Sequence, residues 1–392
     1  MKRRGTALTA SSAALVVAAG VMIVAFGSPG SHASLVSSAA QVSASKPLQP
    51  AVGLQLVSMT PAAGTKGVNG VNPIRVQFSA PLAASSPMPT LSPSIPGHWA
   101  VQGDAAVFTP TVGYLENTRV TVNIPGGLAG LVSVAGANAG DGGTLGSDLS
   151  QSFTTGSFST MRLQQLLAQL GYLPMTWTAK SGSVISPANA KAELSAAYNA
   201  PAGTFTWHSG YPWNLTSQWK AGSGNILDVG AIRAFESVSG MTMDGNASKT
   251  VWSHLLTAVA KNKQNPNGYT YALASQVIPE TLKIWHNGRV VLKTPVNTGI
   301  AASPTVDGTF PVYLKYYFSY MKGTNPDGSQ YDDPVYYASY FNGGDAVHQF
   351  SRGSYGWNQS LGCVELPWDA AERAYPYLTY GSLVTVTGPV GA

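Results

Sequence analysis

The chain of 392 residues has a single cysteine, Cys363, so it cannot form an intramolecular disulfide. Only 10% of its residues are charged, and Lys plus Arg exceed Asp plus Glu by just 22 to 17. It contains no dense basic run of the kind that nucleic-acid binding requires, so we expect no nucleic-acid partner. The six histidines are scattered, and none stands at metal-ligand spacing from the cysteine. We therefore expect neither a metal nor another cofactor.

Glycine and proline are abundant instead, with 43 and 26 residues, and 44% of the chain is hydrophobic. This balance is typical of folded domains with many short strands and turns rather than long helices. A chain of this length is too long for one ordinary hydrophobic core, so we expect two or three domains.

The first 33 residues have the pattern of a secretory signal. A basic stretch at residues 2–4 precedes an apolar run over 7–26, and residues 31–33 offer a cleavage site of small residues. The apolar run has nearly the length that spans a bilayer, so an uncleaved membrane anchor is the alternative to a cleaved signal peptide. In either case the rest of the chain is extracytoplasmic. Residues 34–52, rich in Ser, Ala and Val, are interpreted as a flexible linker.

A solitary cysteine in an exported protein favours a reactive thiol over a structural role. Gly362, immediately before Cys363, allows backbone amides to approach a reacting carbonyl, and Ser360 can orient a neighbouring group. His348 lies fifteen positions upstream, and an adjacent imidazole is the common means of converting a thiol to a thiolate. The alternative is a buried cysteine that only fills space in a core.

Residues 53–157 carry strand signals throughout. Short runs such as 74–78 and 119–124 alternate apolar and polar residues, with Pro and Gly turns between them. The pattern predicts a β-sandwich. The runs 58–64, 107–110 and 152–155 resemble segments of bacterial immunoglobulin-like surface domains. Such a domain is expected to act as a spacer, because the fold alone carries no chemistry.

Residues 158–262 change to helical periodicity. Apolar residues recur at helical spacing over 161–173, and Gly171 is the expected C-terminal stop of this helix. A second helical segment at 232–240 leads to Asp244-Gly245, and a third follows at 249–256. This order resembles the small three-helix peptidoglycan-binding domain, although Glu236 stands where that family usually has glutamine. The stretch 175–230 is longer than that family needs.

The inserted stretch contains four tryptophans, Trp177, Trp207, Trp213 and Trp219. We expect these side chains to pack the inserted stretch, because buried aromatics dominate cores generally. The alternative is that they stack on sugar rings.

Residues 270–390 return to strand signals. The alternating run 281–286 is followed by Asn287-Gly288, a strong two-residue hairpin turn, and by a returning run at 289–292. A tyrosine-rich segment at 316–340 is interpreted as a loop, and the run 345–350 as a strand that carries His348.

Several separate motifs of this region occur in the order found in the L,D-transpeptidase catalytic domain, which residues 270–390 resemble. The motifs are Asn287-Gly288, 296–299, Pro304-Thr305 with 308–310, His348, Ser360-x-Gly362-Cys363, the helix start Asp369-Ala370-Ala371, and 381–386.

The resemblance implies a role for each residue of the site. Cys363 would be the nucleophile that forms a thioester, and His348 the general base and later the acid. The backbone carbonyl of Gln349 would orient the imidazole, amides around Gly362 would form the oxyanion hole, and Ser360 would support the site. The implied partners are peptidoglycan stem peptides and glycan.

Tyr336, Tyr337 and Tyr340 are candidates for a lid over the stem peptide, with ordinary core packing as the alternative. Two positions depart from the family. Leu361 replaces a common histidine before the Gly-Cys pair, and Glu365 replaces arginine or asparagine two residues after the cysteine. A carboxylate there that points into the site would raise the pKa of the Cys363 thiol.

Together these signals predict a multidomain protein: an all-β immunoglobulin-like sandwich, a small mainly α wall-binding-like domain, and a mainly β catalytic domain. The predicted function is peptidoglycan cross-linking by L,D-transpeptidation, in the cell wall or at the outer face of the plasma membrane. A membrane contact follows only if the N-terminal segment stays uncleaved. The alternatives are a catalytically weakened wall-binding scaffold and an L,D-carboxypeptidase. Sequence leaves the oligomeric state open.

Overall fold

A computed structural model describes residues 53–127, 130–133 and 143–388. The predicted signal or anchor (1–33) and the linker (34–52) lie outside the described residues. Among the residues that the structure does describe, no helix combines the length and the apolar character needed to cross a membrane.

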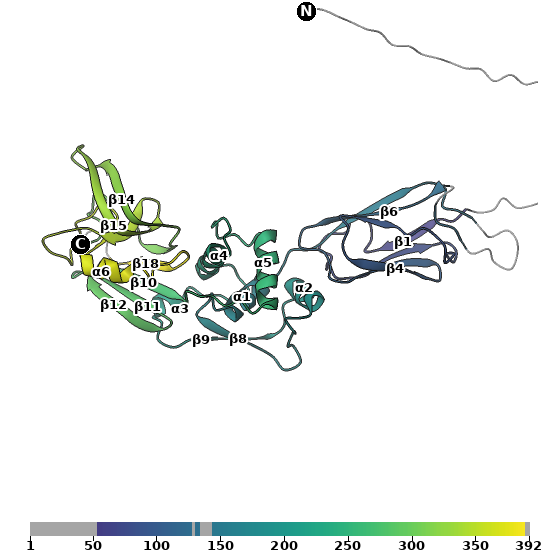
Figure 1. The fold of residues 1–392 in the computed structure, drawn as a ribbon, viewed down its shortest axis with the longest axis horizontal. Coiled ribbons are helices and arrows are strands. Elements are labelled where there is room, and N and C mark those ends of the chain that lie inside the picture. The colour runs from purple at the N-terminus through teal and green to yellow at the C-terminus, as the bar shows by residue number, and fades with distance from the viewer. Residues whose placement is uncertain (1–52, 128–129, 134–142, 389–392) are drawn as a thin grey trace, which may run out of the picture. The chain divides into compact units, whose positions relative to one another are not determined.

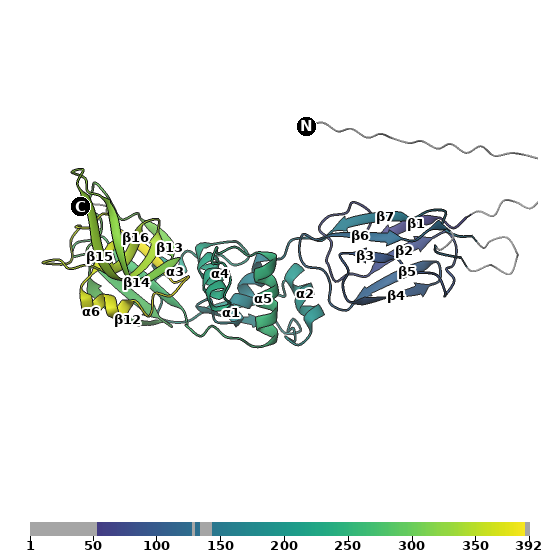
Figure 2. The same ribbon diagram turned by 45° about the horizontal axis from the view of Figure 1, so that its top comes forward.

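The N-terminal domain is the predicted sandwich of two antiparallel sheets (Figure 2). One sheet has the order β1 (Leu56–Thr60), β2 (Ile74–Phe78), β5 (Ala105–Pro110), β4 (Gly97–Gln102), and the other has β3 (Thr90–Ser92), β6 (Arg119–Ile124), β7 (Leu149–Thr154). Strand β2 alternates buried and half-buried residues as its sequence predicts. Val76 from one sheet and Val120 from the other are fully buried in one common core.

The second domain contains three main helices, α1 (Thr160–Gln169), α4 (Ile226–Val238) and α5 (Lys249–Ala260). Helix α1 ends where Gly171 adopts a positive φ of 76°, the predicted C-terminal stop. Helix α4 begins six residues before its predicted start at residue 232, because Asn225 and Asp228 form a capping box around its first turn. Ser248 caps α5 by accepting a hydrogen bond from the Val251 N–H at 3.2 Å.

In the inserted stretch, β8 (Met175–Ala179) pairs antiparallel with β9 (Gly203–Trp207). Helix α2 (Ala190–Tyr198) lies between the two strands in sequence, and α3 (Trp213–Thr216) follows them. Trp177, Trp207 and Trp219 pack against the core of the helical domain, which confirms the packing prediction for three of the four tryptophans. The fourth, Trp213, is 77% exposed.

The C-terminal domain has two sheets. The first has the order β12 (Arg289–Pro295), β11 (Thr281–His286), β10 (Thr270–Ser275), β18 (Leu383–Thr387), β13 (Gly308–Pro311). The second has the order β14 (Leu314–Thr324), β15 (Gln330–Asn342), β16 (Asp345–Gln349), β17 (Val364–Leu366). Helix α6 (Trp368–Ala374) contacts strands of both sheets (Figure 1). Apolar side chains from both sheets and α6 form a single core.

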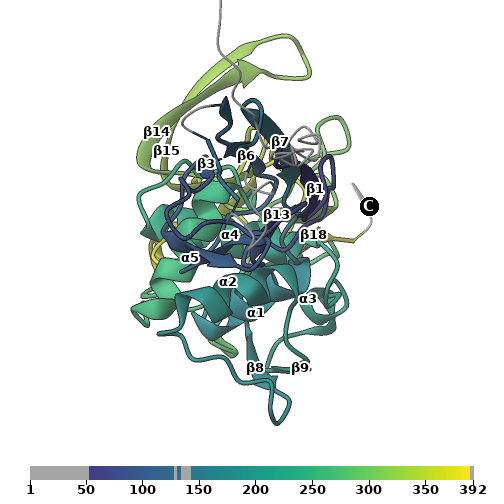
Figure 3. The same ribbon diagram turned by 90° about the vertical axis from the view of Figure 1, so that its right-hand side faces the viewer.

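The predicted turn between β11 and β12 is present. Asn287 and Gly288 both have positive φ, 47° and 76°, as a tight two-residue hairpin requires. The interpretation of residues 316–340 as a loop is wrong, because this segment forms most of the long β14–β15 hairpin (Figure 3). Aromatic residues occupy successive positions of β14 and hide the alternation that would mark a strand, and the hairpin turns at residues 325–329.

The helical and C-terminal domains share apolar packing. Tyr271, Trp285 and Leu383 of the five-stranded sheet belong to the same buried cluster as the helices. Gly230 of α4 lies so close to Gly381 that a Cβ on Gly230 would be 2.7 Å from the Gly381 carbonyl oxygen. The two domains therefore have one continuous core.

Candidate active site

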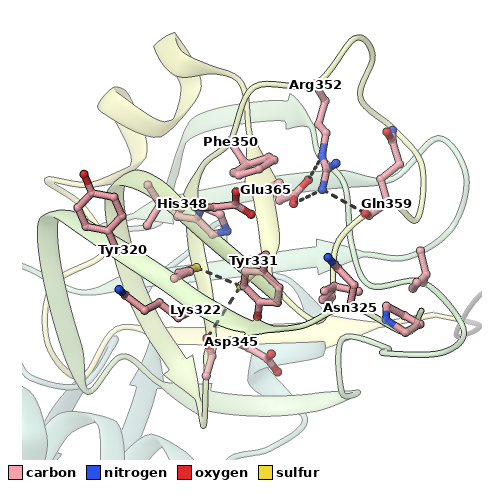
Figure 4. Close-up of a pocket in the computed structure, with 18 of the residues that line it drawn as sticks. Tyr320, Lys322, Asn325, Tyr331, Asp345, His348, Phe350, Arg352, Gln359 and Glu365 are labelled. Carbon is pink, nitrogen blue, oxygen red and sulfur yellow. Dashed lines mark hydrogen bonds and ion pairs between the residues drawn. The ribbon is translucent and has the colours of Figure 1, made fainter. Parts of the chain in front are cut away.

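A cavity of about 800 Å³ opens on the second sheet of the C-terminal domain (Figure 4). Cys363 and His348 both line it. The β14–β15 hairpin forms one wall, with the side chains of Tyr320, Lys322, Tyr331, Asp333 and Tyr340. The predicted nucleophile and base therefore face the same space.

The register of two short strands places these residues together. Strands β16 and β17 pair in parallel, with His348 opposite Glu365. Cys363 lies two residues before Glu365, and side chains two apart in an extended chain share one face. Val347 and Val364, one position away from His348 and Cys363, are buried in the core on the other face.

His348 is buried, with 2% of its surface exposed. Its Nδ1 lies 2.8 Å from the backbone carbonyl oxygen of Gln349, the contact that the resemblance implies. A carbonyl oxygen only accepts hydrogen bonds, so Nδ1 carries the proton and Nε2 is left with a free lone pair. Burial lowers the pKa of His348 below its usual range. The imidazole is therefore neutral at pH 7 and able to take a proton.

Cys363 is a free and partly exposed cysteine. Burial of its thiol, together with the nearby carboxylates of Asp345 and Glu365, raises the pKa of Cys363 to about 12. Its Sγ lies 3.9 Å from the Gly344 carbonyl oxygen and 3.9 Å from Met321 Sδ, and forms no hydrogen bond with the imidazole. The resting group is therefore a thiol rather than a thiolate.

The turn before Cys363 is fixed by glycine and serine. Gly362 has a φ of 116°, and a Cβ there would lie 2.3 Å from Asp345 Oδ1, so only glycine fits. Ser360 is buried, and its hydroxyl donates to the Cys363 carbonyl oxygen at 2.6 Å. The Gly362 N–H, a predicted oxyanion donor, points to Ser360 Oγ at 3.3 Å. That long bond has to open or be shared if the amide is to bind an oxyanion.

A neighbouring segment supports this turn. Asn297 and Glu365 exchange backbone hydrogen bonds, and the Ser360 N–H donates to the Thr298 carbonyl oxygen at 2.9 Å. Thr298 in turn donates from its hydroxyl and from its N–H to the buried carboxylate of Glu280, both at 2.6 Å. The motif at 296–299 thus holds the strand that carries the thiol.

The negative charge of Glu365 is neutralised within the site by an ion pair with Arg352. The Glu365 carboxylate, whose side chain is 5% exposed, accepts from Arg352 Nε at 2.8 Å and from Arg352 Nη2 at 2.7 Å (Figure 4). The guanidinium also donates to the Gln359 carbonyl oxygen and lies 4.6 Å from the centre of the Phe350 ring. Sequence reasoning missed Arg352, because nothing in the local pattern shows that it pairs with Glu365.

Of the three tyrosines predicted as lid candidates, one lines the cavity and two do not. Tyr340 lines the cavity, whereas Tyr336 and Tyr337 do not. Both pack in the core of the domain, and Tyr337 also hydrogen-bonds Glu372. The core-packing alternative therefore describes these two. Leu361 also lines the cavity.

Within residues 53–127, 130–133 and 143–388, no group of three His, Cys, Asp or Glu side chains could hold a metal ion.

Comparison with known proteins assigns two of the domains. Residues 271–386 match the family model of the L,D-transpeptidase catalytic domain, YkuD, and residues 50–155 match that of a bacterial Ig-like domain. The chain thus carries an L,D-transpeptidase catalytic domain of the YkuD family, preceded by a bacterial Ig-like domain. The resemblance of residues 158–262 to a peptidoglycan-binding domain stays a prediction.

Three solved structures illustrate the likeness. An L,D-transpeptidase from Mycobacterium smegmatis is 15% identical over 86% of this chain and 99% of its own, with a TM-score of 0.29. L,D-transpeptidase 3 from Mycobacterium tuberculosis is 14% identical over 85% and 98%, also at 0.29. The catalytic domain of the E. faecium enzyme is 27% identical over 30% and 96%, at 0.28. The search of curated proteins found no match. The assignment rests on the two family models.

Proposed function

We propose that the protein is a peptidoglycan L,D-transpeptidase that acts outside the cytoplasm through a Cys363 thioester. The observation that carries the proposal is that His348 of β16 and Cys363, which directly precedes β17, line one cavity. The YkuD match over residues 271–386 supports the same reaction class.

The first half of the proposed reaction is acylation. Because the thiol and the imidazole are both neutral at rest, His348 Nε2 takes the thiol proton as sulfur attacks the amide carbonyl of a donor stem peptide. Amides around Gly362 bind the tetrahedral oxyanion, a contribution on the order of 3 kcal/mol for each donor. The imidazolium then protonates the leaving amine, and a thioester on Cys363 remains.

The second half is transfer of the acyl group to the amine of another stem peptide. The Ig-like domain would serve as a spacer, the helical domain would bind the wall, and the N-terminal segment would supply export or anchoring. Transfer to water instead would make the protein an L,D-carboxypeptidase.

The proposal is tested by mass spectrometry of the purified protein after incubation with a tetrapeptide stem. We expect a thioester adduct on Cys363 that is lost in Cys363→Ala and strongly reduced in His348→Ala. New cross-links in muropeptides should disappear with Cys363→Ala. Cross-linking by that variant equal to that of the wild type would refute the assignment.

One observation favours a second candidate, a wall-binding scaffold. The thiol has a pKa raised to about 12 and forms no hydrogen bond with His348, which together describe a weakly activated nucleophile. Pull-down on purified peptidoglycan, together with acylation by a carbapenem, separates the two. Wall binding without acylation supports the scaffold, and acylation supports the enzyme.

A further inference from the structure

Asp345 is a half-buried carboxylate at the start of β16, and neither the sequence nor the proposed chemistry gives it a role. It lines the cavity beside the nucleophile. A Cβ on Gly362 would lie 2.3 Å from Asp345 Oδ1, and the carbonyl oxygen of the preceding Gly344 lies 3.9 Å from the Cys363 sulfur. The carboxylate therefore stands next to the sulfur on which a thioester would form.

No cation pairs with Asp345 in the described part of the chain. The two cationic side chains that line the cavity are engaged elsewhere: Arg352 is bound by both oxygens of Glu365, and Lys322 lies 2.8 Å from Asp332. Asp345 accepts one hydrogen bond, from Asn342 Nδ2 at 3.3 Å.

The environment of Asp345 favours a positively charged ligand. The titratable groups that interact with it are the Cys363 thiol and the Tyr313 phenol, neither of which is cationic. Burial raises its pKa to about 6, so it is ionised at neutral pH without a counter-ion. A partly desolvated carboxylate of this kind is stabilised by a cation that enters the cavity.

We propose that Asp345 binds the ammonium group of the acceptor stem peptide and takes its proton before the amine attacks the thioester. This inference rests on the proposed function and concerns its second half. An ammonium nitrogen must lose two protons to become an amide. Asp345 takes the first and later releases it to solvent, and His348 takes the second as the C–N bond forms. When the C–S bond breaks, His348 returns that proton to the sulfur.

The proposal has a consequence for the choice of acceptor. Water carries no charge and needs no counter-ion, so Asp345 favours transfer to an amine over hydrolysis. Removing its charge should therefore lower aminolysis of the thioester far more than hydrolysis of the same thioester.

The test separates the two halves of the reaction. The full chain is first acylated on Cys363 by a tetrapeptide stem, and decay of the adduct is followed by mass spectrometry with and without a stem tripeptide that has a free side-chain amine. For Asp345→Asn we expect acylation at least as fast as in the wild type, because removal of the charge eases thiol ionisation. The ratio of aminolysis to hydrolysis should fall tenfold or more. Asp345→Glu should recover part of the ratio.

Asp327→Asn is the matched control, because Asp327 also lines the cavity but lies in the turn of the β14–β15 hairpin, where its carboxylate accepts from the Ser329 N–H at 2.9 Å and from the Ser329 hydroxyl at 2.6 Å. It should leave the ratio within twofold of the wild type. An unchanged ratio in Asp345→Asn overturns the proposal while leaving the proposed function intact. Absence of the adduct in the wild type overturns the proposed function itself.

The wild-type pH profile provides a second measurement that needs no substitution. If Asp345 accepts the first proton, aminolysis rises with pH through about 6 and then levels off, because the acceptor ammonium remains the bound form. Attack by free amine alone would instead give a rate that increases about tenfold per pH unit from pH 7 to 9, as expected for an amine whose pKa is near 10. That steady increase contradicts the proposal.

Discussion

Replacing Arg352 with alanine should destabilise the catalytic domain and slow its thiol chemistry. The substitution leaves the Glu365 carboxylate, 5% exposed, without its two charge-assisted hydrogen bonds. Breaking a buried ion pair by removing one partner costs about 3–5 kcal/mol. Because the Arg352 side chain is itself 30% exposed, water screens the pair and we expect a smaller loss, about 2–3 kcal/mol.

The loss should appear as a lower unfolding temperature. The catalytic and helical domains share one core, so they should unfold together, and a loss of this size corresponds to roughly 5–10 °C. Scanning calorimetry would measure it. The double variant Arg352→Met, Glu365→Leu should recover most of the loss, since an apolar pair of similar volume removes the unpaired charge. Asp332→Ala, which breaks the exposed Lys322–Asp332 pair, should cause no measurable change.

The same variant has a chemical readout. Glu365 raises the pKa of Cys363, and without Arg352 its charge is uncompensated, so the thiol should become harder to ionise. Alkylation by iodoacetamide at fixed pH should therefore be slower in Arg352→Ala than in the wild type. The reasoning is refuted if Arg352→Ala unfolds within 1 °C of the wild type, or if the double variant is no more stable than the single one.

Three further predictions follow from single contacts. Gly362→Ala should reduce Cys363 acylation by about 100-fold or more, measured by mass spectrometry, because its Cβ would collide with Asp345 and its φ is positive. Glu280→Ala should lower the free energy of unfolding by about 3 kcal/mol in denaturant titrations, since the Thr298 hydroxyl and N–H lose their acceptor. Burial raises the pKa of Glu236 from 4.5 to about 7, so the folded state binds an extra proton between these values. Stability should therefore fall by up to about 3 kcal/mol as the pH rises through that window, and Glu236→Gln should remove this dependence; an equally pH-dependent variant would contradict it.

Short sequence patterns predicted the fold correctly wherever a structural feature depends only on residues that are adjacent in the chain. The Asn287-Gly288 turn, the alternation in β2 and the stop at Gly171 each depend on a few adjacent residues, and each lies where the sequence predicts it. The β14–β15 hairpin was misread because its aromatic residues occupy both faces. The facing tyrosines contact one another across the strands, for example Tyr317 with Tyr337, so partners distant in sequence stabilise the pairing.

In the candidate site, too, some residues could be predicted from the sequence and their surroundings could not. Cys363 and His348 were predicted from spacing and resemblance, and both line one cavity, while the Gln349 carbonyl oxygen lies 2.8 Å from His348 Nδ1, the contact that the resemblance implies. The surroundings that tune them were not found, because Arg352 and Asp345 act on the thiol through contacts that no sequence period records. Tyr336 and Tyr337 were candidates by residue type alone, and only the fold reveals that their rings face the core.

The parallel ladder between β16 and β17 has a consequence for how the protein tolerates insertions. A shift of one residue in this three-residue ladder would turn Val364 toward solvent and the sulfur toward the core, leaving the rest of the sheet formed. An extra residue between Arg352 and Gln359 would disturb the hydrogen bonds of Gly356 with Val296 and Glu280, but it lies outside the ladder and leaves it aligned. The same insertion between Cys363 and Val364 would give a folded chain whose thiol is on the wrong side of the sheet.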